Sequence, residues 1–368
     1  MDTTAEKLNL LGVPQGALES FFAEKDERPY RARQLLQWIH QRGITDFDLM
    51  TDLSKRLRTN LKPVATIEVA TTISENVSAD GTVKWLFESG SGQAVETVFI
   101  PEPGRGTLCI SSQVGCALDC AFCATGAQGF NRNLTSAEII GQVWHANRVL
   151  PPRANGEPAI TNIVFMGMGE PLANYRNVLP VLDLLLSDFA YGLSRRRVTI
   201  STSGLVPNIE RLADECNVSL AVSLHATNDE LRDRLVPINK VHPIRKLLDA
   251  CWQYAAKHSN RFITFEYVML EGVNDSLAHA DELVGLLKDR PAKVNLIPFN
   301  PFAGNDFVCS GRNRIAEFQN RLRQRGLVAT TRKTRGQDID AACGQLAGKV
   351  SDRVRVRLSE KTIRMATA

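Results

Sequence analysis

The stretch TLCISSQVGCALDCAFC, residues 107–123, begins as a short apolar strand and ends in a loop that carries three cysteines. Cys116, Cys120 and Cys123 follow a C-x3-C-x2-C spacing. Three thiolates spaced in this way can hold three irons of a [4Fe–4S] cluster and leave the fourth iron open to a substrate-like ligand. Clusters that only carry electrons tend to use four cysteines. The segment therefore predicts a [4Fe–4S] cluster at the end of a β-strand.

A structural zinc site is the main alternative for these cysteines. Structural zinc takes four Cys or His ligands, and no His or Cys lies within twenty residues beyond Cys123. Phe122 could shield a cluster from water, and Gly126 and Gly129 allow the backbone to approach it closely. These features favour the iron–sulfur interpretation.

Downstream of the cysteines, short apolar strands alternate with helical stretches. We expect strands at 107–112, 161–166, 197–202, 218–223, 262–269 and 293–298, and helices at 135–149, 175–188, 205–215, 243–258, 276–289 and 311–325. Six such units predict an α/β fold, a parallel sheet covered by helices and curved into a partial, TIM-like (βα)6 barrel. Right-handed crossovers place all strand C-termini on one rim, where such folds keep their chemistry.

Upstream of the cysteines, the pattern changes twice. The first sixty residues have helical periodicity and predict a small, basic helical accessory domain at 1–62, to which the family resemblance given below assigns RNA binding. Strands expected at 67–74, 82–89 and 94–100 form a β-hairpin extension that spans 63–101. The barrel then occupies 102–338, and a C-terminal segment with a basic tail occupies 339–368.

The composition describes a globular protein with an ample core, at 43% hydrophobic and 23% charged residues in a chain of 368. The start, MDTTAEKLNLLGVPQG, has neither the basic nor the apolar region of a signal peptide. No run of about 20 apolar residues could span a bilayer. We therefore expect a cytoplasmic protein without membrane contact. Eight cysteines in such a chain favour metal binding or catalysis over structural disulfides.

The net charge is only +4, but basic residues are concentrated near the end of the barrel. Between positions 310 and 335, Glu317 alone opposes Arg312, Arg314, Arg321, Arg323, Arg325, Arg332, Lys333 and Arg335. Arg195 to Arg197 and the tail KVSDRVRVRLSEK add further positive charge. Such a concentration can follow a phosphate backbone, although a solvated helix face is the simpler interpretation of the run alone.

A second motif, GMGEP at 167–171, follows the expected strand 161–166. By itself it would more often be an ordinary strand-to-helix loop. With the three cysteines, however, the chain resembles the radical S-adenosylmethionine (radical SAM) superfamily. The resemblance implies that the amino and carboxylate groups of S-adenosylmethionine chelate the open iron and that reductive cleavage gives a 5′-deoxyadenosyl radical. It also implies that Gly169 lets the backbone approach the cofactor and that Glu170 binds its ammonium group.

Further segments narrow the resemblance: SSQVGCALDC, GFNRNLT, FMGMGEPLANY, STSG, SLHA, IPFNPF and ACGQLAG. Between about residues 30 and 348 the chain is similar to the bacterial dual-specificity RNA adenine-C2 methyltransferases, the RlmN family. The resemblance implies methylation of one adenosine in the peptidyl-transferase centre of 23S rRNA and of the adenosine 3′ of the anticodon in certain tRNAs. It also implies a flavodoxin-type electron donor, and we expect a monomer.

The same resemblance assigns residues to the cofactor, each at or just beyond the end of an expected strand. They are Gly169, Glu170, Ser201, Ser223, Leu224, His225 and Asn300. Taken singly, a Ser or Asn after a strand is usually a helix cap, and His225 could be a core histidine with satisfied hydrogen bonds. Their joint placement on one rim favours the cofactor assignment.

Three residues are implied to carry the reaction itself: Cys343, Cys109 and Glu96. Cys343 would be methylated by one S-adenosylmethionine, and a second would activate that methyl group to attack adenine C2, so that two are consumed per turnover. Glu96 would remove the C2 proton from the covalent adduct. Cys109 would release the RNA by attacking the sulfur of Cys343, which leaves a disulfide bond. Without the resemblance, packing roles would be preferred for Cys109 and Glu96.

The remaining cysteines, Cys216, Cys251 and Cys309, are expected to be inert packing residues.

Two rival functions remain at this point. The related C8-adenine rRNA methyltransferases of the resistance group are expected to carry a cysteine before the Gly of the cluster loop and GMGEA in place of GMGEP. This chain has Val114 and Pro171 at those positions, which favours C2. The other rival, a non-catalytic iron–sulfur RNA-binding protein, would leave GMGEP, STSG and SLH unexplained.

Overall fold

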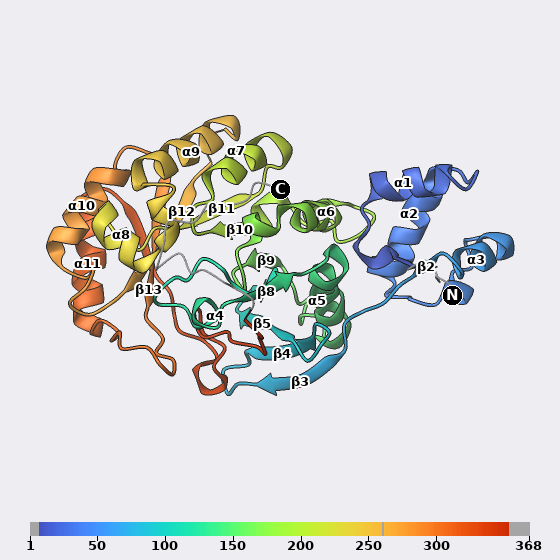
Figure 1. Ribbon diagram of the computed structural model, residues 1–368, viewed down its shortest axis with the longest axis horizontal. Helices are drawn as coiled ribbons and strands as arrows, with labels where there is room; N and C mark the ends of the chain where they lie inside the picture. Colours follow the sequence, from blue (N-terminus) through green and yellow to red (C-terminus); the bar gives the residue numbers. More distant parts are fainter. Residues whose placement is uncertain (1–6, 260, 353–368) are drawn as a thin grey trace.

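The computed structural model describes residues 7–259 and 261–352 (Figure 1). An N-terminal unit, blue in Figure 1, stands beside the larger body of the molecule. It comprises β1 (Leu8–Asn9), η1 (Leu10–Gly12), α1 (Gln15–Ala23), α2 (Tyr30–Leu36), the π-helical η2 (Gln37–Gln41), η3 (Phe47–Leu49), α3 (Lys55–Leu61) and β2 (Ala65–Thr66). Because β2 pairs with β1, this unit continues past residue 62.

The extension consists of three antiparallel strands, β3 (Thr72–Val77), β4 (Val83–Glu88) and β5 (Ala94–Glu102). The first of them begins at Thr72 rather than at residue 67. The side chain of Asn9 donates to the carbonyl of Glu68 at 2.9 Å and accepts from its N–H at 3.2 Å, so the N-terminal unit occupies these backbone groups. β5 also pairs antiparallel with the first barrel strand, so the extension continues the barrel sheet.

The barrel strands form one parallel series from β6 to β14. They are β6 (Arg105–Cys109), β9 (Asn162–Phe165), β10 (Val198–Thr202), β11 (Ser219–Ser223), β12 (Ile263–Met269), β13 (Ala292–Pro298) and β14 (Val328–Thr331). The α/β partial-barrel fold is confirmed. β14 was not predicted from the sequence, because it consists of only four residues, VATT, between polar segments.

The helices that cover the sheet agree with the expected ranges to within two residues, except for one that was missed. They are α5 (Ser136–Val149), α6 (Tyr175–Leu186), α7 (Val206–Glu215), α8 (Asp229–Leu235), α9 (Ile244–Lys257), α10 (Leu277–Leu287) and α11 (Arg312–Gln324). α5 begins where Thr135 and Glu138 form a capping box. The missed helix is α8, whose sequence DELRDRL looks polar although its Arg232 is fully buried.

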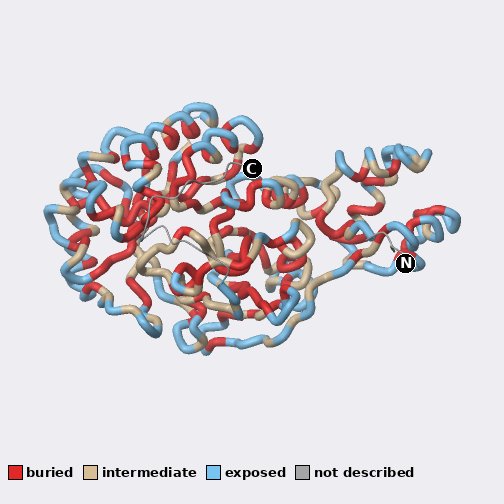
Figure 2. Tube along the Cα trace, in the orientation of Figure 1, coloured by how far each residue is buried: buried red, intermediate tan, exposed pale blue. Residues whose placement is uncertain are grey.

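Figure 2 shows buried strands at the centre of the larger body and exposed residues on the helices around them. Since β6 and the six strands that follow it in the sheet are parallel, their carboxyl ends share one rim. The segment that carries the three cysteines, here called the cluster loop, lies at that rim. It contains β7 (Gln113–Gly115), α4 (Ala124–Ala127) and β8 (Phe130–Asn133). Within the described part of the chain, every helix is too short or too polar to span a membrane.

Candidate active site

The three cysteines of the motif lie in the cluster loop against the rim. The Sγ of Cys120 lies 3.7 Å from the hydroxyl of Ser203, just after β10, and the N–H of Ala121 donates to the carbonyl of Leu235 at 3.1 Å. Burial raises the pKa of the Cys120 thiol to about 12, and the neighbouring Cys123 contributes to that rise. The loop thus holds its thiols away from water.

The donor set fits a cubane cluster. Among residues 7–259 and 261–352, no three His, Cys, Asp or Glu side chains converge on a single metal ion. In a [4Fe–4S] cluster each thiolate binds a different iron, so its ligands do not need to converge on one point. The guanidinium of Arg232, whose charge acts on Cys120, also suits a site that gathers thiolates. Cys116, Cys120 and Cys123 would hold the cluster.

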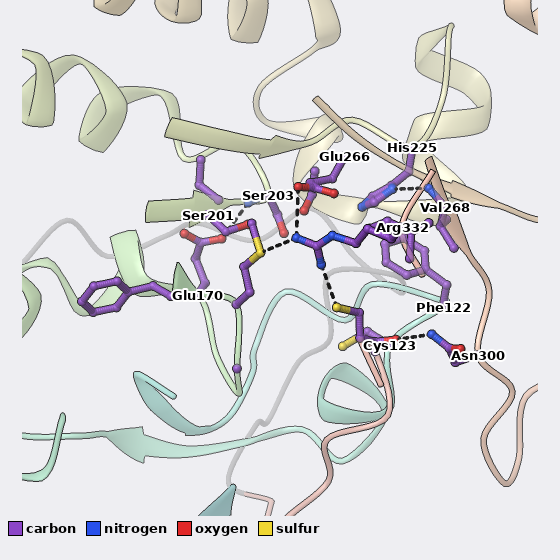
Figure 3. Close-up of a pocket in the computed structure, with 18 of the residues that line it drawn as sticks. Phe122, Cys123, Glu170, Ser201, Ser203, His225, Glu266, Val268, Asn300 and Arg332 are labelled. Atoms are coloured by element: carbon purple, nitrogen blue, oxygen red, sulfur yellow. Dashed lines mark hydrogen bonds and ion pairs between the residues drawn. The ribbon is translucent and has the colours of Figure 1, made fainter. Parts of the chain in front are cut away.

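A cavity of about 150 Å³ adjoins the cluster loop (Figure 3). It is lined by residues from the carboxyl ends of the strands and from the C-terminal segment. Among those predicted from the sequence are Cys123, Gly169, Glu170, Ser201, Ser223, His225, Asn300 and Cys343.

The GMGEP turn forms one wall of this cavity. Gly169 has φ 93°, and a Cβ atom there would lie 2.4 Å from the Cβ of Gln113, so both the conformation and the space require glycine. The carboxylate of Glu170 accepts from the N–H of Leu172 at 3.0 Å and from the N–H of Ser203 at 2.7 Å. Burial nevertheless raises the pKa of Glu170 to about 7. A cationic ligand would therefore be favoured beside this carboxylate.

His225 lines the cavity two residues after the end of β11, with φ 58°. Its Nδ1 accepts from the N–H of Val268 at 2.9 Å, which leaves the proton of the neutral ring on Nε2. Burial, assisted by the charge of Arg232, lowers the pKa of His225 to about 3. The ring of Phe122 packs edge-on against it at 4.4 Å between centroids. His225 is thus a neutral hydrogen-bond donor fixed beside the cluster loop.

Asn300 and Leu224 occupy different places at the rim. Asn300 lines the cavity, but its Nδ2 donates to the carbonyl of Cys343 at 3.1 Å, so it also anchors the C-terminal loop. Leu224 is fully buried and does not line the cavity. Its carbonyl accepts from Nε of Arg232 at 3.1 Å, which places it in the support of the rim.

The loop that carries Cys343 is docked onto the cluster loop. The N–H of Ala124 donates to the carbonyl of Gly344 at 2.8 Å, and the hydroxyl of Thr125 donates to the carbonyl of Leu346 at 2.5 Å. Lys349 then forms a β-bridge with Ala94 at the start of β5. Residues more than two hundred positions apart therefore meet at the cavity.

Glu96 and Cys109 lie behind this loop rather than in the cavity lining. The buried carboxylate of Glu96 pairs with Nζ of Lys84 at 3.0 Å and accepts from the N–H of Ala347 at 2.9 Å. Cys109 is buried at the end of β6, and burial, together with the nearby Cys343, raises its pKa to about 12.

The disulfide expected between Cys109 and Cys343 is not formed in this structure. All eight cysteines are free. The expected disulfide is the product of the release step, so it belongs to the enzyme after it has reacted with RNA.

Four residues of the site were not found from the sequence: Met166, Glu266, Arg332 and Lys84. Arg332 was counted with the basic surface, but its guanidinium lies in the cavity and donates to Sγ of Cys343. The signal that could have found it is its position directly after β14, at the carboxyl end of a parallel strand. Because that strand was missed, so was the residue.

Several of the other clustered basic residues have partners within the protein. Arg321 and Arg325 both pair with Asp281, and Nε of Arg323 donates to the carbonyl of Ala329. Arg195–Arg197 (η5) precede β10, at the end of the barrel opposite the rim. Most of the basic tail lies outside the described residues.

Comparison with known proteins gives matches over both parts of the chain. Residues 8–67 match the family described as "Ribosomal RNA large subunit methyltransferase N-terminal domain", and residues 110–284 match the radical SAM superfamily. The crystal structure of a radical SAM methyltransferase from Sphaerobacter thermophilus is similar at 45% identity and a TM-score of 0.85, over 92% of this chain and 99% of that one. A domain of pyruvate-formate lyase-activating enzyme from Bacteroides vulgatus matches at 17% identity and a TM-score of 0.37, over 47% of this chain and 99% of that one.

Proposed function

Because this chain belongs to the radical SAM methyltransferases and carries the N-terminal domain of the ribosomal RNA large subunit enzymes, we propose that it methylates carbon 2 of adenine in RNA. The substrates are adenine 2503 of 23S rRNA and adenine 37 of tRNA. The observation that carries the proposal is the docking of the Cys343 loop onto the cluster loop, with Cys343 in the cavity. A cysteine held there can accept a methyl group and present it to RNA.

When bound, the [4Fe–4S] cluster and S-adenosylmethionine supply a methyl group and a radical that can abstract a hydrogen atom. Adenine C2 is an sp² carbon without an acidic hydrogen, so ordinary displacement does not methylate it. Cys343 provides another route, because a thiolate can take up a methyl group. One hydrogen atom of that group would go to the radical, the remaining methylene carbon would bond to C2, and the one surplus electron of the adduct would pass to the cluster. The RNA is at that stage joined covalently to the protein.

Release of the RNA requires a base and a second thiol. Glu96 takes the C2 proton, and its carboxylate is bound to the Cys343 loop through the N–H of Ala347. The thiolate of Cys109 attacks the sulfur of Cys343, so that a sulfur–sulfur bond forms and the sulfur–methylene bond breaks. The electron pair leaves with the carbon, which gains a proton and becomes the methyl group. Cellular thiols reduce the resulting disulfide before the next turnover.

RNA binding is assigned to basic residues outside the cavity and to the N-terminal unit. Arg312 and Arg314 begin α11, which runs from the rim, and both are exposed. Contacts of this kind release counterions, so RNA affinity should fall steeply with salt. Since the target base must leave its stack, a loop should be preferred over a perfect duplex.

The decisive experiment is to map methyladenosine isomers. RNA from a strain that lacks this gene is treated with reconstituted enzyme, S-adenosylmethionine and a reduced flavodoxin, and its nucleosides are analysed by mass spectrometry. We expect 2-methyladenosine in 23S rRNA and tRNA. 8-Methyladenosine would instead indicate the resistance-type reaction, and failure to cleave S-adenosylmethionine would contradict a catalytic role.

A further inference from the structure

Arg332 stands at the carboxyl end of β14, where its N–H donates to the carbonyl of Leu296 at 2.8 Å. Its guanidinium reaches across the cavity (Figure 3). Nη1 donates to Sγ of Cys343 at 2.8 Å, and Nη2 donates to Sδ of Met166 at 3.1 Å. Nη2 also lies 3.5 Å from a carboxylate oxygen of Glu266. One cation thus contacts two sulfur atoms and a carboxylate.

Glu266 pairs with this cation within the cavity. It lies on β12 with 4% of its side chain exposed, and its second oxygen accepts from Nδ2 of Asn295 at 2.9 Å. A carboxylate this buried needs a cation opposite it. Burial alone would lower the pKa of Arg332, but the charges of Glu266, Cys343 and Cys109 outweigh it and raise that pKa. Arg332 therefore keeps its charge in the cavity.

On the basis of the proposed function, in which Cys343 accepts a methyl group, we propose that Arg332 is the positioning residue that holds the sulfur of Cys343 in the cavity by a hydrogen bond and stabilises negative charge on that sulfur when it attacks. The contact with Met166 is to a weak, uncharged acceptor. The contact with Cys343 is of the charge-assisted kind, which is shorter and about twice as strong as a neutral hydrogen bond. The main chain of Cys343 is anchored separately by Asn300, so Arg332 acts on the side chain.

The methyl transfer changes what Arg332 faces. The electron pair of the Cys343 thiolate forms the new sulfur–methyl bond, and the carbon–sulfur bond of the sulfonium donor breaks, with its pair kept by the departing S-adenosylhomocysteine. Cys343 is then a neutral thioether, so its sulfur becomes a weak acceptor for Arg332. The positive charge remains beside Cys109, where it lowers the pKa of that thiol against the effect of burial. The same guanidinium therefore supports both cysteines in the order in which they act.

The test measures the nucleophilicity of Cys343 without methyl donor or RNA. Cluster-loaded wild-type enzyme and the Arg332→Met variant are treated with iodoacetamide at pH 7.5 under anaerobic conditions. The alkylation rate of Cys343 is followed by peptide mass spectrometry, with Cys309 as the internal reference. Because the thiolate is the reactive form, Arg332→Met should slow alkylation of Cys343 by about tenfold or more. Arg332→Lys, which keeps the charge but not the fork of donors, should fall in between.

Matched variants separate this role from a general disturbance. Arg335→Met removes an arginine of the same loop that pairs with Asp80 instead, and it should leave the alkylation rate of Cys343 unchanged. If Arg332→Met fails to fold because Glu266 is left unpaired, the double variant Arg332→Met/Glu266→Gln removes both charges and should show the same slow alkylation. Alkylation within twofold of wild type in the folded, cluster-loaded variant overturns the proposal. A wild-type enzyme with reactive Cys343 that forms no 2-methyladenosine contradicts only the proposed function.

Discussion

The cluster loop and the Cys109–Cys343 pair are both built from cysteines, but the chain brings them together in different ways. The cluster cysteines lie within eight residues of one another, in a loop fixed to the rim by local and neighbouring contacts. Cys109 and Cys343 come from opposite ends of the barrel sequence and both act on Arg332. A metal site can thus be encoded in one segment of sequence, whereas the proposed two-cysteine reaction requires the complete tertiary fold.

Loss of a cluster cysteine should have the largest effect. Protein purified without oxygen should be brown with about four irons per chain. Cys120→Ala should abolish the colour, iron binding and cleavage of S-adenosylmethionine, because each thiolate holds its own iron. Cys309→Ser, a change at a partly buried cysteine outside both groups, should keep the iron. If the protein instead bound zinc and kept its activity, the three cysteines would not hold an iron–sulfur cluster.

The two members of the distant pair should fail in different ways. Cys343→Ala removes the acceptor, so neither protein nor RNA should gain a methyl group, while the cluster and slow cleavage of S-adenosylmethionine remain. Cys109→Ala keeps the acceptor but removes the thiol that releases the adduct. It should accumulate RNA joined to Cys343, seen as a nuclease-sensitive species of high mass on a denaturing gel. Parallel losses of activity without the adduct would indicate packing roles for both cysteines.

Two asparagines that follow β13 allow a finer test of the two groups. Nδ2 of Asn300 donates to the carbonyl of Cys343, whereas Nδ2 of Asn305 donates to the carbonyl of Ala121 in the cluster loop at 2.7 Å. A hydrogen bond of this type contributes about 1 kcal/mol. Asn300→Ala should slow methylation of Cys343 about fivefold with normal iron content, measured by mass spectrometry of the protein. Asn305→Ala should instead speed iron loss to a chelator, and identical phenotypes would mean that the loops are not separable.

The smallest effect is expected at His40, outside both cysteine groups. His40 is buried between the N-terminal unit and the barrel, with Nδ1 3.2 Å from the hydroxyl of Tyr191, and burial lowers its pKa to about 3. Below pH 6.5 the unfolded chain therefore binds a proton that the folded chain does not, so stability falls as the pH falls. From pH 7.5 to 5.5 this lowers the free energy of unfolding by about 1 kcal/mol.

His40→Phe should remove that part of the pH dependence, measured as the difference in thermal midpoint between pH 7.5 and 5.5. His279→Gln, a change at an exposed histidine of α10, should retain it. An equal pH dependence of stability in wild type and His40→Phe would show that the protonation of His40 does not affect stability. The alkylation rate of Cys343 should be the same in both variants, because neither histidine lies near the two cysteine groups.

Several elements were predictable because their signals are local. The alternation of apolar strands and amphipathic helices predicted six strands and six helices of the barrel to within three residues. α8 and β14 were not predicted, for different reasons. The buried Arg232 makes the sequence of α8 look polar, and β14 is only four residues long. The strand expected from residue 67 begins later, because the side chain of Asn9 in the N-terminal unit forms hydrogen bonds with the backbone N–H and carbonyl of Glu68.

The sequence by itself determined the cluster cysteines, the GMGEP turn and the order of strands that puts His225 and Asn300 on one rim. Residue spacing and periodicity define these features locally. A parallel sheet with right-handed crossovers then places the carboxyl ends of its strands on one rim. Only the tertiary structure decided that Arg332 leaves the basic surface for the cavity, and that Glu96 meets the Cys343 loop through Ala347. Such contacts depend on which distant parts of the chain come together. The hydrogen bonds and ion pairs that hold them form only when the tertiary fold is complete.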